Sequence, residues 1–182
     1  MLFIGPEMCV LGISKQLAML TSTHTLVSLL LLPCALMAQE ITPAWGLPLS
    51  GPGEERSYAI TLDATGHAYS AGNFTGTVDF DPGAGVAELS SAGSNDIYVA
   101  KYDTNGTLVW ARSMGGTYSD GASGIAVDDA GNIYITGGFS GTADFDPGPG
   151  TFNMTAATTG QNDIYIAKLD ANGDFVWAKG IV

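Results

Sequence analysis

Two short acidic motifs hold the side chains best suited to bind a metal ion. One contains Asp79 and Asp81 and the other Asp144 and Asp146, in each case two residues apart and directly before Pro-Gly. Carboxylate oxygens are hard ligands that suit Ca²⁺, which needs about six to eight of them. No glutamate or further aspartate follows at the spacing of a calcium loop. We therefore predict that these four aspartates serve turns and exposed strand positions, and we keep a calcium site as the alternative.

Other reactive side chains form no recognisable catalytic group. His67 is the one histidine after residue 38, and its counterpart in the repeat described below is Asn132. The sequence has no Ser/His/Asp grouping, phosphate-binding loop or histidine-rich metal spacing. Asp96 and Asp163 each precede an expected strand. They serve either as structural hydrogen-bond acceptors or as a second acidic pair, and the sequence does not decide between these roles. A carboxylate pair for sugar hydrolysis stays open because acids are plentiful, but we predict a protein without catalytic or cofactor-binding residues.

The charge balance limits the classes of partner. The chain has 182 residues, 18 of them acidic and 6 basic, which gives a net charge of −12. Nucleic-acid binding depends on clustered Lys and Arg, and docking on anionic lipid needs basic segments. We therefore predict no nucleic-acid partner and no electrostatic membrane docking. The 25 glycines indicate many turns between short strands.

Residues 1–38 resemble a leader that is removed on export. The apolar run Leu26–Leu32 is followed by small residues up to Ala38, as in a secretory signal peptide, and Lys15 supplies the basic region if translation starts at Met1 or Met8 rather than Met19. The run is short for a membrane anchor, which needs roughly 20 apolar residues. A lipoprotein signal at Cys34 is a minor alternative. Both cysteines, Cys9 and Cys34, lie in this leader, so the mature chain cannot form disulfides.

The rest of the chain, 39–182, contains one unit written twice. Residues 66–83 match 131–148 at an offset of 65, and 95–101 match 162–168 at an offset of 67. Tryptophans mark equivalent points at positions 45, 110 and 177. We therefore expect units at about 45–109 and 110–176, with a third begun at 177.

Each unit has the pattern of short antiparallel strands. Apolar and polar residues alternate in runs rich in β-branched and aromatic side chains. The runs are joined by turns that begin at Asp63, Asp103, Asp129 and Asp170 and close on glycine. The expected strands cover 57–63, 67–74, 76–80, 96–102, 108–113, 123–128, 132–139, 141–145, 163–169 and 174–179, with weak outer strands in 84–92 and 149–158. The predicted fold class is all-β, with antiparallel meander sheets as β-propeller blades, two full units of a partial propeller.

Three segments carry a family resemblance. Residues 131–137, 163–170 and 173–177 resemble the SBBP (seven-bladed β-propeller) repeat, and the Phe-Asp-Pro-Gly hairpins resemble a long version found in exported bacterial proteins, often of the Bacteroidota. The resemblance covers about residues 45–182. It implies the fold and carries almost no information on chemistry, because propellers host many unrelated functions.

Two units would leave an open sheet face at each end, since propellers need about 4–8 blades. We therefore expect a fragment of a longer chain, with missing blades or self-association covering the faces. The predicted function is an exported, non-enzymatic scaffold that binds protein or glycan at the cell surface, with no membrane span after leader cleavage. The alternatives are an exported hydrolase or lyase with its active site in missing blades, and a truncated product without independent function.

Overall fold

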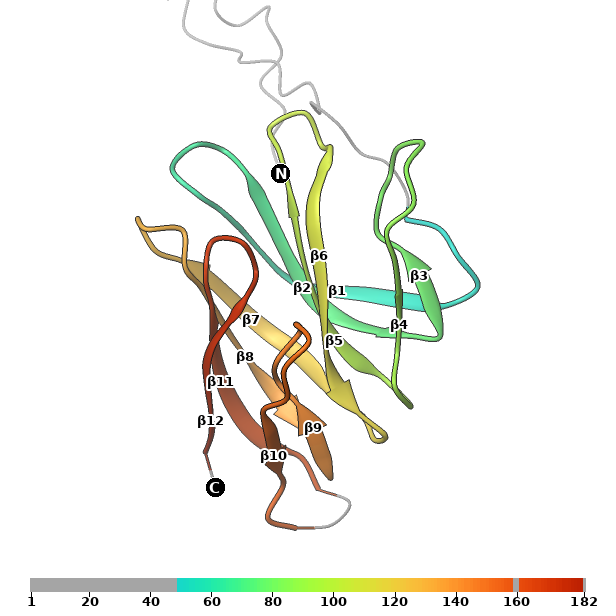
Figure 1. Ribbon diagram of the computed structural model, residues 1–182, viewed down its shortest axis with the longest axis vertical. Helices are drawn as coiled ribbons and strands as arrows, with labels where there is room; N and C mark the ends of the chain where they lie inside the picture. The colour runs from blue at the N-terminus through green and yellow to red at the C-terminus, as the bar shows by residue number, and fades with distance from the viewer. Residues whose placement is uncertain (1–48, 159–160, 182) are drawn as a thin grey trace, which may run out of the picture. The chain divides into compact units, whose positions relative to one another are not determined.

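The computed structural model describes residues 49–158 and 161–181. The predicted leader, residues 1–38, and Trp45 lie outside this part of the chain. Within it the fold is all-β, with twelve strands and no helix (Figure 1). None of these residues belongs to a helix that could cross a membrane. The predicted fold class is thus confirmed, as antiparallel sheets consistent with propeller blades.

The first blade is a four-stranded antiparallel meander. It is formed by β1 (Glu54–Leu62), β2 (Ala68–Thr75), β5 (Asp96–Tyr102) and β6 (Leu108–Gly116), paired in that order. A short hairpin, β3 (Thr77–Asp79) and β4 (Glu88–Ser90), is inserted between β2 and β5. Leu62 pairs with Ala68 and Tyr102 with Leu108 at the turns.

The second blade repeats this plan. Its strands β7 (Gly121–Val127), β8 (Ile133–Phe139), β11 (Asp163–Leu169) and β12 (Phe175–Ile181) pair consecutively, with the hairpin β9 (Thr142–Asp144) and β10 (Asn153–Thr155) inserted after β8. The expected weak strands in 84–92 and 149–158 are β4 and β10, which pair with β3 and β9.

Each inserted hairpin is also tied to the strand that precedes its own blade. Gly115 in β6 pairs with Asp144 in β9, and Ser50 forms the equivalent bridge to Asp79 in β3. The offset of 65 seen in the sequence therefore describes a repeated three-dimensional arrangement.

The turns within each blade depend on an aspartate and a glycine. Asp63, Asp103 and Asp170 accept hydrogen bonds from backbone N–H groups two and four residues later. In the remaining turn, between β7 and β8, the prediction that Asp129 is the turn residue is wrong. Asp128 accepts from the N–H groups of Ala130 and Asn132 at 3.0 and 2.9 Å. The turn has four residues, as in Asp63–Gly66, and its closing glycine has a positive φ of 81°.

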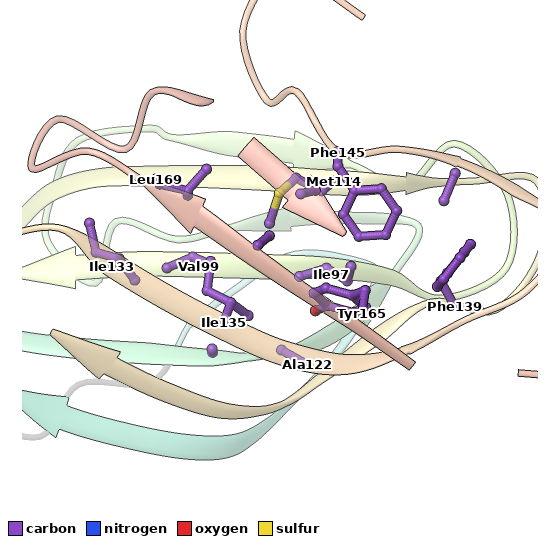
Figure 2. Packing of buried hydrophobic residues seen from close by; sticks show 14 of the residues in the cluster. Ile97, Val99, Met114, Ala122, Ile133, Ile135, Phe139, Phe145, Tyr165 and Leu169 are labelled. Atoms are coloured by element: carbon purple, nitrogen blue, oxygen red, sulfur yellow. The ribbon is translucent and has the colours of Figure 1, made fainter. Parts of the chain in front are cut away.

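The described residues form two hydrophobic cores, and one of them joins the blades. The smaller lies in blade one and includes Phe74, Phe80 and Tyr98. The larger joins the blades, with Ile97 and Val99 from β5 packed together with residues of β8 and β11 (Figure 2). We call the boundary that this larger core fills the seam.

Candidate functional site

The predicted acidic motifs form the two inserted hairpins. Asp79 Oδ1 accepts from the backbone N–H of Asp81 at 3.0 Å and of Ala87 at 2.8 Å, and Asp81 Oδ1 accepts from Gly83 N–H at 2.7 Å. This network pins both ends of the Pro-Gly loop.

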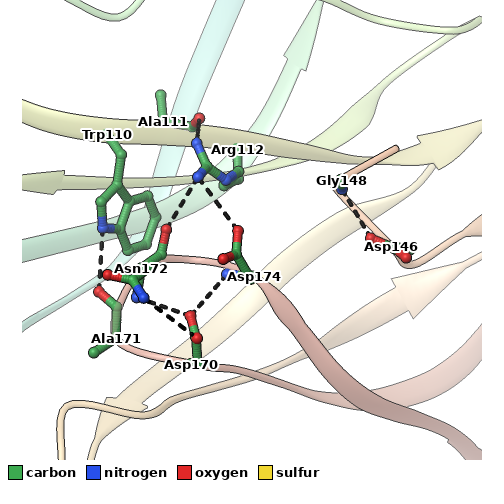
Figure 3. Close-up of polar contacts among 9 residues, drawn as sticks. All are labelled: Trp110, Ala111, Arg112, Asp146, Gly148, Asp170, Ala171, Asn172 and Asp174. Carbon is green, nitrogen blue, oxygen red and sulfur yellow. Dashed lines mark hydrogen bonds and ion pairs between the residues drawn. The ribbon is translucent and has the colours of Figure 1, made fainter. Parts of the chain in front are cut away.

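The copy in blade two has the same network. Asp144 Oδ1 accepts from the backbone N–H groups of Asp146 and Phe152. Asp146 Oδ1 accepts from Gly148 N–H at 2.8 Å (Figure 3). Among residues 49–158 and 161–181, no three His, Asp or Glu side chains are grouped so that they could share a metal ion. The geometry accounts for all four aspartates as supports of a turn, and calcium binding stays a prediction.

His67 belongs to a turn. Its Nδ1 lies 2.6 Å from Thr65 Oγ1 and 3.2 Å from Asp63 Oδ2. Its counterpart Asn132 donates from Nδ2 to Asp128 Oδ2 at 2.8 Å. Both side chains thus contact the aspartate of the turn, which explains why histidine and asparagine occupy equivalent positions.

A buried carboxyl group at the seam escaped the sequence analysis. Asp120, only 2% exposed, lies in the loop between β6 and β7. Its Oδ2 accepts from Gly116 N–H at 2.8 Å and its Oδ1 from Ser140 N–H at 3.0 Å. Its own N–H donates to Asn95 O at 2.7 Å. Asp120 therefore joins the end of β6 to the segments around β5 and β8 of the two blades.

A second buried acid lies close to Asp120. Asp96 is 3% exposed, its Oδ2 accepts from Ala92 N–H at 2.7 Å, and its Oδ1 has no hydrogen-bond partner among the described residues. Burial raises the pKa of Asp96. Burial likewise raises the pKa of Asp120 to about 6, with a smaller contribution from the negative charge of Asp96. Both interpretations of Asp96 from the sequence apply in part. Asp96 accepts a structural hydrogen bond, and it has an acidic neighbour, which is Asp120 and not Asp163.

A polar pocket of about 160 Å³ opens beside Asp120. Both blades contribute side chains with hydroxyl, amide or carboxyl groups to its wall: Tyr58, Asn73, Ser119, Asp120, Ser123 and Asn162. The sequence contained no clear signal for this pocket. The position equivalent to Asp120 in the other unit is Glu55, so comparing the two units does not single out Asp120.

Polar contacts also close the outer part of the seam (Figure 3). The Trp110 indole N–H donates to Ala171 O at 3.4 Å, and Arg112 donates to Asn172 O at 3.0 Å. Arg112 also lies 3.6 Å from the carboxylate of Asp174. The last strand of blade one thereby holds the last turn of blade two.

Comparison with known families agrees with this architecture. Residues 109–137 match the family model described as SBBP, beta-propeller repeat. The chain carries an SBBP beta-propeller repeat. The matched SBBP segment begins in β6 and ends in β8, so it crosses the seam and includes Asp120.

Two curated proteins are similar to parts of this chain. An uncharacterized WD repeat-containing protein of Acanthamoeba polyphaga mimivirus is 25% identical over 113 residues, which are 54% of this chain and 8% of that protein. Regulatory protein FlaEY of Caulobacter vibrioides is 36% identical over 87 residues, 47% of this chain and 9% of FlaEY. The chain thus spans less than a tenth of each relative. Together with the SBBP match, these similarities support a β-propeller repeat scaffold.

Proposed function

We propose that this chain is an exported, non-enzymatic β-propeller scaffold that binds a glycan or a protein at the cell surface, and that the seam pocket is its binding site. The observation that carries the proposal is the composition of that pocket. Hydroxyl, amide and carboxyl groups from both blades surround one small cavity. Such groups match the hydroxyl groups of a sugar, which both donate and accept hydrogen bonds.

The contacts of Asp120 support binding rather than catalysis. Both carboxylate oxygens accept backbone N–H groups, so the side chain is held in one position. A general acid or base needs a proton-transfer path to substrate, and here each oxygen is already fixed by one backbone N–H and can accept one further hydrogen bond. Asp120 then serves as a rigid acceptor in the pocket wall.

Glycan-array screening followed by isothermal titration tests the binding site. We expect Asn73→Ala and Asn162→Ala to weaken binding at least tenfold, because each removes an amide from the pocket. Asn153→Ala, an exposed position in β10, is the matched control and leaves affinity unchanged. Failure to bind any glycan or any cell-surface extract contradicts the proposal.

Export is tested separately. The proposal requires cleavage after Ala38, so the protein recovered outside the cell begins at Gln39. N-terminal mass spectrometry of the secreted protein checks this. A protein that retains residues 1–38 in the cytoplasm contradicts export without affecting the binding site.

The hydrolase alternative draws on one observation, the raised pKa of Asp120 beside Asp96. A carboxyl group with a pKa of about 6 has the proton affinity that a general acid needs. Turnover of glycosides or polysaccharides that Asp120→Asn abolishes, while the variant stays folded, replaces the scaffold proposal with an enzyme.

A further inference from the structure

Equivalent side chains in the two blades differ sharply in exposure. Ile97 and Val99 in β5 are fully buried in the seam. Their counterparts Ile164 and Ile166 in β11 are 54% and 37% exposed. We call the sheet face that carries Tyr134, Thr136, Ile164 and Ile166 the acceptor face. It has an apolar groove of about 360 Å³, lined by residues of β7, β8 and β11.

The opposite end of the described structure has a matching difference. Ile125 and Val127 in β7 pack against the seam core. Their counterparts in β1, Ile60 and Leu62, are 70% and 63% exposed. We call the face formed by Ile60 and Leu62 the donor face. At the seam, residues equivalent to the donor face contact residues equivalent to the acceptor face.

The acceptor face keeps the side-chain arrangement of the buried seam. At the seam, Lys101 Nζ lies 5.0 Å from the centre of the Tyr69 ring. On the acceptor face, Lys168 Nζ lies 5.1 Å from the centre of the Tyr134 ring.

The aromatic contacts repeat as well. The rings of Tyr69 and Trp110 meet edge to face at 6.2 Å, and those of Tyr134 and Trp177 at 6.5 Å. The uncovered acceptor face therefore has the same cation–ring and ring–ring contacts as the covered face of blade one.

We propose that the acceptor face of blade two binds the donor face of blade one in a second copy of this chain, head to tail. The seam supplies the argument for this occupant, because it is the same pairing of faces made within one chain. In this contact, β7, β8 and β11 of one copy pack against β1 and β2 of the other. The edge of β3 takes no part in this contact, because Ser50 of the same chain already pairs there with Asp79. The proposal is independent of the ligand proposed for the seam pocket.

The proposed contact has two consequences. Because different faces meet, each dimer leaves one face of each kind free, and association continues into rings or open chains. Each copy carries a net charge of −12, so added salt screens the repulsion between copies and strengthens association.

Complementation of two variants tests the geometry, using the full chain and sedimentation equilibrium. Ile166→Asp disables the acceptor face and Ile60→Asp the donor face. We expect wild type to associate and each variant alone to be at least a hundredfold weaker. An equimolar mixture of the two variants forms a one-to-one dimer, because one acceptor face and one donor face remain intact.

Circular dichroism confirms that both variants fold, and Ile164→Asp and Leu62→Asp replace any variant that does not. Val86→Asp, at a 75% exposed position in the loop between β3 and β4, is the matched control and associates like wild type. Monomeric wild type overturns the proposal, as does a mixture that stays monomeric. Self-association of Ile60→Asp alone also overturns it, because that result means two acceptor faces pair with each other.

Discussion

The two blades share one sequence pattern and one strand order but differ in what covers them. Ile97 in β5 is fully buried while its counterpart Ile164 in β11 is 54% exposed. The same holds for the acids beside them. Asp96 and Asp163 accept hydrogen bonds from the equivalent N–H groups of Ala92 and Ala157, yet only Asp96 is buried. The repeat therefore specifies backbone and local bonding, and the neighbouring blade decides burial.

The inserted hairpins make the contrast clearer, because their packing is the same in both blades. Rings of Phe74 and Phe80 meet at 5.6 Å and 90°, and those of Phe139 and Phe145 at 5.3 Å and 90°. The next ring contact, to Tyr98 or Tyr165, is 4.8 Å in each copy. This hairpin core belongs to the unit itself and forms in the first and the second blade alike.

The largest expected difference between the blades comes from truncating equivalent isoleucines. Ile97→Ala leaves a cavity in the seam and should lower the free energy of unfolding by about 2–4 kcal/mol. Ile164→Ala removes an exposed side chain and should cost under about 1 kcal/mol. Urea denaturation at low protein concentration measures both. Equal losses of unfolding free energy in the two variants would contradict the conclusion that Ile97 is covered by the neighbouring blade and Ile164 is not.

The acids at the seam should give blade one its own pH dependence. The pKa of Asp120 is raised from 3.8 to about 6, so the folded state binds this proton more tightly than the unfolded state. Its contribution to the free energy of unfolding is therefore largest below about pH 4 and is lost as the pH rises to about 6. We expect this loss to be about 1–2 kcal/mol, because solvent screens part of the effect.

Melting temperatures between pH 4 and 7 test this dependence. We expect Asp120→Asn to reduce the loss of stability on raising the pH, and the raised pKa of Asp96 accounts for the loss that remains. Asp163→Asn, in the uncovered blade, should leave it unchanged. An unaltered pH profile in Asp120→Asn would show that Asp120 titrates normally.

A smaller effect distinguishes neighbouring aspartates of one turn. The side-chain hydrogen bond from Asn132 leads the contacts that lower the pKa of Asp128. Asp128→Ala should lower the melting temperature by about 2–4 °C. Asp129→Ala should have little effect, because the turn uses Asp128. Thermal unfolding at pH 7 compares them, and the reverse order would restore Asp129 as the turn residue.

The smallest expected effect is that of calcium on the two hairpins. Each is held by its own backbone N–H groups, so added Ca²⁺ should change the melting temperature by under about 1 °C. A larger rise that Asp79→Asn and Asp144→Asn both remove would establish the calcium site instead. Mg²⁺ at the same concentration controls for ionic strength.

Local features were accessible from the sequence because they depend on a few consecutive residues. The alternation in Ile133–Phe139 and the turn at Asp170 and Gly173 predicted a strand and a hairpin, and both are present. The error at Asp129 arose because two aspartates are adjacent, and only the hydrogen-bonding register separates them. The acid pair at the seam was not accessible from the sequence for a different reason: Asp96 meets Asp120 through folding, and Asp120 has no counterpart of its type in the repeat.

The sequence by itself determined the repeat unit, its strands and its turns, since periodicity, glycine and turn aspartates act over short distances. Only the tertiary structure decided which face of each blade is covered, which carboxyl groups are buried and where the polar pocket lies. Ile97 and Ile164 occupy the same place in the same motif, so nothing local separates them. Their difference comes from the packing of one sheet on another, because burial is a property of the neighbours that a residue meets after the chain has folded.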